Sequence, residues 1–464
     1  MRSQRSRAFA PRPSRAERYA IGKSLRDKCP RKSHATWTPG PDRPDPIAVV
    51  LAAEKGRLPE LLPLRHGRMA QSPFTFYRGS ALAMATDLAT TPTSGIHVQC
   101  CGDAHLSNFG GFATPERRVI FSINDLDETL PAPWEWDVKR LAASFVVACR
   151  ASGLGKSAAK EAVLACARSY REHMAEFSEM KALGLWYYTL DADAMIATIR
   201  DPKVRRRAQK RLAAERGRSV AEDIFPKLAA AQDGAHFIKD QLPAIFHWKG
   251  HSPGEVARAV KDTFASYRET LPPATRVLLD RFEIKDAAIK VVGIGSVGTR
   301  CWVLLLMAEA GDPFFLQVKE ARASVLEPFA GRSVFPNHGQ RIVNGYRLMQ
   351  PYSDMFLGWT KGPLGAHYYF RQLRDIKISV RVETFDVSTM VLYAQRCGQA
   401  LALAHARGGD AALLSGYLGK SDTFDKALAA FSFAYADQNE KDHAALRRAV
   451  RAGKIKAKFE RERS

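Results

Sequence analysis

The sequence predicts an α+β protein of two lobes, a small lobe rich in β-strands and a larger lobe built mainly of helices. Residues 155–280 are rich in Ala, Arg, Lys, Glu and Leu and are expected to be helical almost throughout. Residues 281–385 change to runs such as AAIKVVGIGSVG and PFFLQVKEA, which are typical of strands. The chain has 464 residues and is 46% hydrophobic, so it can bury a sizeable core.

Residues 1–46 are expected to form a basic, partly disordered arm that ends at the Pro-rich boundary TWTPGPDRPDP. The other end, LRRAVRAGKIKAKFERERS, is also basic. The formal charge of +22 predicts attraction to an acidic partner through these termini. Because no zinc-finger spacing, aromatic RNA-binding motif or heptad zipper accompanies the charge, the sequence indicates no specific nucleic-acid binding.

The sequence predicts neither export nor membrane insertion. No apolar run reaches the roughly 18 to 20 residues that span a bilayer, and the N-terminus lacks the apolar core of a secretory signal. The 7 Cys residues form no CxxC pair and suggest neither a disulfide framework nor a zinc site. A cytoplasmic protein is therefore expected.

Residues 47–154 are expected to carry a polar loop between short strands. From GIHVQC to RVIFSIND the pattern is strand, loop, strand, turn and strand, and EWDVKRLAASFVVACRAS then has the spacing of a partly buried helix. Asp103 and Asn108 lie five positions apart in the loop GDAHLSN, and Asp125 and Asp127 follow the last strand. A cluster of carboxylates and amides is therefore expected beside the strand ends.

This cluster has the residue types that phosphoryl transfer from a nucleotide requires. One carboxylate orients the acceptor hydroxyl, while an amide oxygen and a second carboxylate hold Mg²⁺. A kinase catalytic loop has its Asp and Asn five residues apart, and its metal-binding Asp follows a pair of strands. Each residue taken singly is more commonly a turn residue next to a glycine, but the spacing and the flanking strands together favour the functional interpretation.

A glycine-rich stretch, VVGIGSVGT, follows an apolar strand and leaves two interpretations open. In a dinucleotide-binding fold, Gly298 would be followed by the helix TRCWVLLLMAEAG and later by an acidic residue near Glu320. In a kinase, the glycines form the bend of a strand hairpin over the phosphates, and Lys319 on the third strand reaches them. The acidic cluster favours the kinase interpretation, because a dinucleotide-binding domain has no role for it.

The order of these parts differs from that of an ordinary kinase, in which the glycine loop and the lysine come before the catalytic loop. A circular permutation explains the order, since domain termini often lie close together at the surface. Residues 281–385 would then be the nucleotide-binding lobe, and residues 386–464 would be helices that complete the large lobe. Lys319 and Asp125, 194 positions apart, should face each other across one cleft.

Segments along nearly the whole chain resemble the bacterial family called domain of unknown function 2252. They include FYRGSALAMATDLA, GDAHLSNFG, NDLDETLPAPWEWDVKRLAAS, GIGSVGTRC, QVKEA and RQLRDIK. Separately, GDAHLSN followed by IND and EWD is similar to the HGDxHxxN, IDF and DLA run of aminoglycoside and choline phosphotransferases. This second resemblance implies a protein-kinase-like fold, here in circularly permuted order.

The resemblance to phosphotransferases implies a role for each matching residue. Asp103 would be the catalytic base, and Lys319 would be the catalytic lysine that anchors the phosphates. Glu327 is the expected partner of Lys319, since the side chain of Glu320 should point to the opposite face of the strand, and the helix NHGQRIVNGYRLMQ offers no acid. The implied cofactors are ATP and Mg²⁺, with the metal held by Asn108, Asp125 and Asp127 and the phosphates held by Gly293, Gly295, Ser296 and Gly298.

The expected function is that of an ATP- and Mg²⁺-dependent phosphotransferase that acts on an unidentified hydroxyl acceptor, a protein or a small molecule. Two alternatives stay open at this point. One is a dinucleotide-binding oxidoreductase of the Rossmann type, and the other is a catalytically silent, basic binding protein on a kinase scaffold. Nucleotide preference distinguishes the first two functions, and turnover distinguishes the first from the third.

Overall fold

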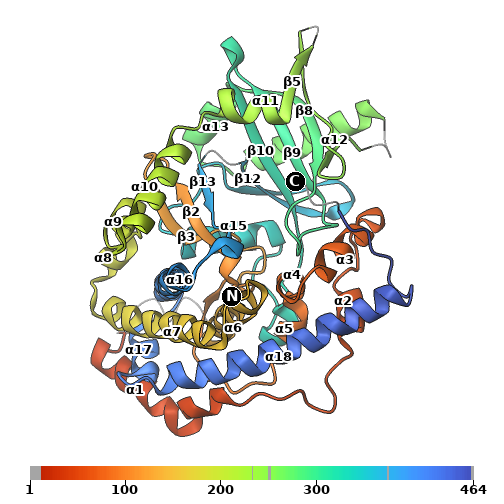
Figure 1. The fold of residues 1–464 in the computed structure, drawn as a ribbon. Coiled ribbons are helices and arrows are strands. Elements are labelled where there is room, and N and C mark those ends of the chain that lie inside the picture. Colours follow the sequence, from red (N-terminus) through yellow and green to blue (C-terminus); the bar gives the residue numbers. More distant parts are fainter. Residues whose placement is uncertain (1–11, 233, 249–251, 374–375, 461–464) are drawn as a thin grey trace, which may run out of the picture.

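A six-stranded antiparallel sheet and a larger body of helices make up the fold (Figure 1). The computed structural model describes residues 12–232, 234–248, 252–373 and 376–460. At this level the predicted α+β class is confirmed. None of the helices in these four ranges is both long and apolar enough to cross a lipid bilayer.

The helices are α1 Arg15–Lys28, α2 Pro46–Ala52, α3 Leu62–Ala70, α4 Pro73–Gly79, α5 Ala81–Leu88, α6 Trp134–Ala151, α7 Lys156–Glu179, α8 Ala182–Tyr187, α9 Ala192–Ala197, α10 Pro202–Arg216, α11 Phe225–Leu228, α12 Pro253–Arg268, α13 Pro273–Leu279, α14 Glu327–Ala330, α15 His338–Met349, α16 Val387–Gly408, α17 Ala411–Leu418 and α18 Thr423–Arg451. The strands are β1 His97–Cys100, β2 Phe109–Ala113, β3 Val119–Ile123, β4 Leu130–Pro133, β5 Ala229–Gln232, β6 Ala235–Ile238, β7 Ile245–Phe246, β8 Glu283–Lys290, β9 Cys301–Met307, β10 Pro313–Ala321, β11 Gly358–Lys361, β12 His367–Gln372 and β13 Lys377–Ser379.

The main sheet has the strand order β11-β12-β10-β9-β8-β7, and each neighbouring pair is antiparallel. Successive side chains of a strand face opposite sides of the sheet. On β10, Leu316 and Val318 therefore pack into the apolar cluster beneath α12, whereas Gln317 and Lys319 face the other side. This alternation decides which side of the sheet carries polar groups.

The glycine-rich stretch joins two antiparallel strands. β8 and β9 pair from Glu283 opposite Met307 to Ile289 opposite Trp302, so the residues between them form the bend of a hairpin. Of the segment TRCWVLLL, which a dinucleotide-binding fold requires as a helix, all but the first two residues belong to β9. The Rossmann alternative needs a parallel strand and a helix at this place, and the arrangement does not support it.

Helices α6, α7, α16, α17 and α18 form the core of the larger lobe (Figure 1). α6 is buried along almost its whole length, and the ring of Trp134 at its start stacks on Tyr170 of α7 with centroids 5.7 Å apart. α16 packs closely along α7, because Gly398 leaves no side chain at the contact. A Cβ atom there would lie 2.3 Å from the carbonyl oxygen of Cys166.

Two small sheets hold the polar loops between the lobes. β1 pairs with β4, and β2 lies between β3 and β13. The loop of residues 101–108 connects β1 to β2, and the acidic residues 125–128 follow β3. Phe109 at the start of β2 lies opposite Ile123 at the end of β3. This pairing brings the loop and the acidic residues together, although Asp125 comes 17 positions after Asn108.

The basic N-terminal segment is folded from residue 12 onward. α1 begins at a capping box in which Ser14 and Glu17 each bond the other's backbone N–H. The helix packs on α17, where Arg18 binds Asp410 at 2.7 Å. This differs from the expected arm, because α17 supplies a surface and a carboxylate that the local sequence does not reveal. Residues 1–11 lie outside the described residues.

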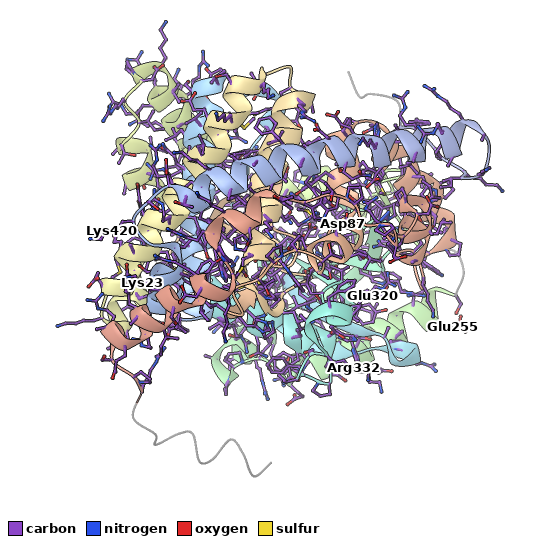
Figure 2. The ribbon with its side chains drawn as sticks, turned by 90° about the horizontal axis from the view of Figure 1, so that it is seen from below. Lys23, Asp87, Glu255, Glu320, Arg332 and Lys420 are labelled. Carbon is purple, nitrogen blue, oxygen red and sulfur yellow. The ribbon has the colours of Figure 1, made fainter. Side chains whose placement is uncertain are left out.

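The segment just before α2 is anchored by charge. Arg43 lies between two carboxylates, 2.7 Å from Asp87 of α5 and 2.6 Å from Asp442 of α18. All three side chains are at most 13% exposed. Figure 2 shows α18 crossing the whole of this face, with Asp87 close to it. Residues 12–46 are thus part of the helical lobe.

Residues 155–280 are mainly helical, but they contain three short strands that the sequence did not predict. β5 and β6 form a hairpin, and β7 extends the main sheet by pairing with β8. Strands of two to four residues are too short for an alternating pattern to develop. Their partners in the tertiary structure therefore decide their conformation. None of the described residues of this segment lines the cavity that contains Asp103.

Candidate functional site

The loop that contains Asp103 and Asn108 is held by helix α6. Both carboxylate oxygens of Asp137 accept hydrogen bonds from the loop backbone, from the N–H of Cys101 at 2.5 Å and from the N–H of Gly102 at 2.9 Å. Glycine is required at position 102, since its φ is +83° and a Cβ atom would lie 2.3 Å from the carbonyl oxygen of Glu128. Asp137 thus fixes the position of the loop.

Cys100, Asp137 and His405 lie close enough together to suggest a metal site. Their hydrogen bonds argue against one. Nε2 of His405 donates to Asp137 at 3.1 Å, and its Nδ1 accepts from the hydroxyl of Tyr170 at 2.8 Å, so both ring nitrogens are used. Burial raises the pKa of the Cys100 thiol and disfavours a thiolate ligand. We assign this cluster a structural role.

Asp103 is paired with a buried arginine from the same helix. Arg140 lies one turn after Asp137, and its Nε donates to Oδ1 of Asp103 at 2.6 Å, while its Nη2 contacts the same oxygen. The nearest nitrogen of His105 is 3.9 Å from Oδ2. Burial lowers the pKa of His105 to about 3, so this ring is neutral. Oδ2 is therefore the oxygen with which Asp103 can meet a ligand.

Lys319 reaches from β10 to the acidic residues that follow β3. Its Nζ lies 2.5 Å from Oδ2 of Asp127 and 3.6 Å from Oδ2 of Asp125. Tyr369, directly opposite Lys319 on β12, donates its hydroxyl to Oδ1 of Asp127 at 2.5 Å. The predicted proximity of Lys319 and Asp125 is confirmed, and these contacts join the sheet to the helical lobe.

Burial and charge act in opposite directions on this ion pair. Burial favours the neutral form of the Lys319 ammonium, but the carboxylates of Asp125 and Asp127 hold its pKa above the usual value. Burial, and then Asp125, raises the pKa of Asp127, while Lys319 lowers it. Because Nζ and Oδ2 are only 2.5 Å apart, the charged pair is the form that fits this geometry.

The glycine loop between β8 and β9 is shaped by two residues with left-handed backbone conformations, Gly293 with φ of +64° and Gly298 with φ of +90°. Arg68 of α3 donates to the carbonyl oxygen of Gly293 at 2.7 Å. Between the two glycines, Gly295 and Ser296 line the cavity described next. The N-terminal helices, which the sequence did not connect with the site, therefore hold the loop in place.

These elements enclose a cavity of about 280 Å³ between the lobes. Its walls carry charges of both signs. The acidic side chains are Asp103, Asp125, Asp127, Glu128 and Glu320, and the basic side chains are Arg57, Arg65, Arg78 and Arg322. Five of the predicted site residues do not line it, namely Asn108, Gly293, Gly298, Lys319 and Glu327.

The arginines are the residues that sequence reasoning missed. Burial lowers the pKa of Arg57 to about 9, and repulsion from Arg65 and Arg322 adds to this effect. Nε of Arg78 is buried and has no hydrogen-bond partner among the described residues. Desolvated cations around a cavity favour an anionic ligand. They belong to no motif, since they come from the N-terminal helices and from the end of β10.

Asn108 lies beside the acidic residues although it does not line the cavity. Its side-chain Nδ2 donates to the backbone carbonyl oxygen of Asp103 at 2.8 Å. The backbone carbonyl oxygen of Asn108 accepts from the backbone N–H of Asn124 at 2.6 Å. Asn124 directly precedes Asp125. Asn108 thus connects the loop to the residue predicted to hold metal.

Among the described residues, Glu327 forms no ion pair with Lys319, its expected partner. It begins α14, and its Oε1 is 3.9 Å from Nδ1 of His338. Within the described part of the chain, Lys319 forms its ion pairs with Asp125 and Asp127 instead. The helix that follows, α15, contributes Arg341, whose Nη2 donates to the carbonyl oxygen of Asp127 at 2.9 Å. The acidic partner therefore comes from the other lobe.

Comparison with family models places this site in a known group of sequences. The model of the bacterial family described as an uncharacterized conserved protein, domain of unknown function 2252, matches residues 57–449. The chain belongs to this family. The match includes every charged residue of the cavity, and the family description assigns no activity. No curated protein and no solved structure matches the chain.

The residues of this family member fit a magnesium ion and a nucleotide phosphate in their chemistry. Carboxylate oxygens are preferred ligands of Mg²⁺, and the side chain of Asp125 is 34% exposed at the cavity. Asp127 is 23% exposed and bonds Tyr369 and Lys319 closely, so the more exposed Asp125 is the better candidate for a metal ligand. The four arginines that line the cavity and the glycine loop suit an anion such as a phosphate.

The raised pKa of Glu128 predicts how the stability of the protein depends on pH. Burial, and then Asp103 and Asp127, raises its pKa from 4.5 to about 7, although Arg341 and the N–H of Val325 favour the charged form. Because the pKa of this carboxyl is higher in the folded state than in the unfolded state, its neutral form contributes to the free energy of unfolding. This contribution is fully present below about pH 4.5 and is lost as the pH rises through 7.

We expect Glu128→Gln to remove this loss. The free energy of unfolding of the variant minus that of the wild type should be about 2 kcal/mol larger at pH 8 than at pH 5. Urea unfolding at each pH measures this difference. Glu116→Gln, in the exposed turn between β2 and β3, should follow the wild type at each pH. Parallel curves for Glu128→Gln and the wild type would contradict the assignment.

Proposed function

We propose that this protein is an ATP- and Mg²⁺-dependent phosphotransferase that acts on a hydroxyl acceptor. The observation that carries the proposal is the contact of Lys319 with Asp125 and Asp127, two residues that line the cavity that also contains Asp103. Phosphoryl transfer needs a cation for the phosphates, carboxylates for a metal and a carboxylate for the acceptor at one place. Here two distant parts of the chain combine to supply them.

The strand order supports a kinase-like nucleotide lobe in circularly permuted order. The glycine loop joins β8 and β9, the lysine lies on the next strand, β10, and the helix α15 follows, as in the nucleotide lobe of a kinase. After this lobe, α16 returns to the loop of Asp103, where the hydroxyl of Tyr393 donates to the carbonyl oxygens of Leu106 and Phe109.

Each residue has a defined task in the proposed reaction. ATP supplies the phosphoryl group, and Mg²⁺ neutralises its charge. Oδ2 of Asp103 accepts the hydrogen bond of the acceptor hydroxyl and takes up its proton, while Arg140 holds Oδ1. Asp125 and Asp127 offer oxygens to the metal, and Lys319 supplies positive charge beside them. Gly295 and Ser296 present the loop to the phosphates.

A second candidate function, binding without turnover, is favoured by the Asp103–Arg140 ion pair. Arg140 already occupies Oδ1 of Asp103, as in an ion pair whose role is structural. Both oxygens of Asp127 already contact Tyr369 and Lys319, which also favours binding without turnover. Release of ADP from ATP distinguishes the two functions, because a silent scaffold binds the nucleotide without turnover.

We expect ATP with Mg²⁺ to stabilise the protein, since a ligand that binds only the folded state adds RT ln(1 + [L]/Kd). This amounts to about 2.7 kcal/mol at a hundredfold excess over Kd. A thermal-shift panel of ATP, GTP, NAD and NADP, each with and without Mg²⁺, measures the effect. A shift with NAD and none with ATP would reject the proposed function and restore the oxidoreductase alternative.

A further inference from the structure

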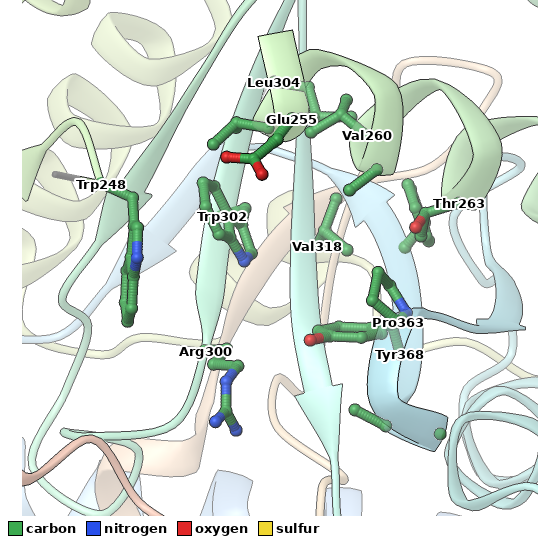
Figure 3. Close-up of a pocket in the computed structure, with 15 residues that line it drawn as sticks. Trp248, Glu255, Val260, Thr263, Arg300, Trp302, Leu304, Val318, Pro363 and Tyr368 are labelled. Carbon is green, nitrogen blue, oxygen red and sulfur yellow. The ribbon is translucent and has the colours of Figure 1, made fainter. Parts of the chain in front are cut away.

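A second cavity, of about 630 Å³, lies on the face of the main sheet opposite Lys319 (Figure 3). Side chains of β9, β10 and β12 form its floor, α12 covers it, and residues 363–366 close one side. The apolar lining includes Trp302, Leu304, Val318, Phe370, Val256 and Val260. Ligand pockets in proteins are typically about 300 to 1,000 Å³ and mostly apolar, and this cavity has both properties.

The cavity exists because α12 packs against the sheet at only one end. Near the C-terminal end of α12, the ring of Tyr267 is fully buried and stacks on Phe370 with centroids 3.9 Å apart. Towards the N-terminal end, Val256 and Ala259 are only half-buried and line the cavity. Protein interiors are normally close-packed, so two apolar walls that do not meet leave space for an apolar group.

Polar groups lie at defined places around this apolar space. Nε1 of Trp248 is buried and has no hydrogen-bond acceptor among the described residues. Figure 3 shows Glu255 at one end of the cavity and Arg300 at the other. Arg300 is 36% exposed and uses Nη1 for an ion pair with Glu320 at 3.2 Å. An anionic head group is attracted to the Arg300 end and repelled from the Glu255 end.

We propose that this cavity binds an amphipathic carboxylate, a molecule with a long apolar body and one carboxylate group. The body lies between α12 and the sheet, where it completes the packing of Val256, Ala259 and Val318. The carboxylate lies at Arg300, and a ligand oxygen can accept the hydrogen bond of Trp248. This site is separate from the cavity of Asp103 and does not depend on the proposed phosphotransfer.

Isothermal titration calorimetry with dodecanoate tests the site. We expect the wild type to bind dodecanoate and Ala259→Trp to bind it at least tenfold more weakly, because the new indole occupies the cavity. Ala257→Trp places the same side chain on the exposed face of the same helix and should leave the affinity unchanged. The melting temperatures of both variants establish that they are folded.

A second variant tests the head group. Arg300→Gln should weaken dodecanoate binding about tenfold but leave the binding of dodecanol unchanged, since only the carboxylate interacts with the guanidinium. Equal affinities of Ala259→Trp and the wild type for dodecanoate would overturn the proposal, as would a wild type that does not bind it. A wild type that binds dodecanol as tightly as dodecanoate would overturn the assignment of the carboxylate to Arg300.

Discussion

Replacing Lys319 by methionine is expected to lower the free energy of unfolding by about 3 kcal/mol at pH 7. Methionine keeps most of the apolar stem and removes the ammonium that lies 2.5 Å from Asp127. The side chain of Lys319 is 3% exposed and that of Asp127 is 23% exposed, so the change leaves a half-buried carboxylate without its cation, and the expected cost is at the lower end of the roughly 3 to 5 kcal/mol of a fully buried pair. Urea unfolding monitored by circular dichroism measures the change.

Two further variants make this result specific. Lys319→Met combined with Asp127→Asn should recover part of the lost stability, because the double variant no longer buries an unpaired charge. Lys285→Met removes an exposed lysine that pairs with Glu283 on β8, and it should cost less than about 1 kcal/mol. If Lys319→Met and Lys285→Met were equally mild, the buried ion pair would not link the two lobes as described.

Asp103→Asn is expected to reduce phosphoryl transfer by about 10²- to 10⁴-fold, the usual contribution of a general base. Asparagine keeps an Oδ1 that can accept the hydrogen bonds of Arg140, so the loop should retain its position. The variant cannot take up the acceptor proton. Release of ADP or AMP from ATP, followed by chromatography, measures turnover and also distinguishes phosphoryl transfer from AMP transfer.

Nucleotide binding separates this effect from unfolding. The thermal shift with ATP and Mg²⁺ should be nearly the same in Asp103→Asn and the wild type, since the residue acts on the acceptor. Asp312→Asn, exposed and distant from the cavity, should keep full turnover. Equal turnover in Asp103→Asn and the wild type would remove the catalytic role of Asp103 and favour a silent binding scaffold.

Some site residues could be predicted because their spacing along the chain carries information. The five-residue interval between Asp103 and Asn108, together with Asp125 after a strand pair, was enough to predict that these groups lie beside one another. Arg140 was missed although the sequence contains a signal for it. It stands three positions after Asp137 on a predicted helix, and residues at this interval lie on the same face, where both contact the loop.

Other residues carried no local signal. Glu327 was the expected partner of Lys319 because Glu320 should point to the opposite face of the strand, but Oε1 of Glu327 lies 3.9 Å from Nδ1 of His338. Asp127 takes that place because the helical lobe brings it to β10. The four arginines of the cavity come from the turns after α2, from α3, from α4 and from the residue after β10, and no spacing rule relates segments so far apart.

The sequence left open whether a helix or the strand β9 follows Gly298, and the pairing of β9 with β8 and β10 decided this. The sequence by itself determined the helices of the large lobe, the strands β8, β10, β11 and β12, and the loop of Asp103. These depend on periodicity, propensity and backbone conformation, which act over a few residues. Only the tertiary structure decided which charges meet and where cavities remain. Lys319 pairs with Asp127, α1 packs on α17, and α12 is separated from the sheet at one end. Such contacts depend on how whole elements pack.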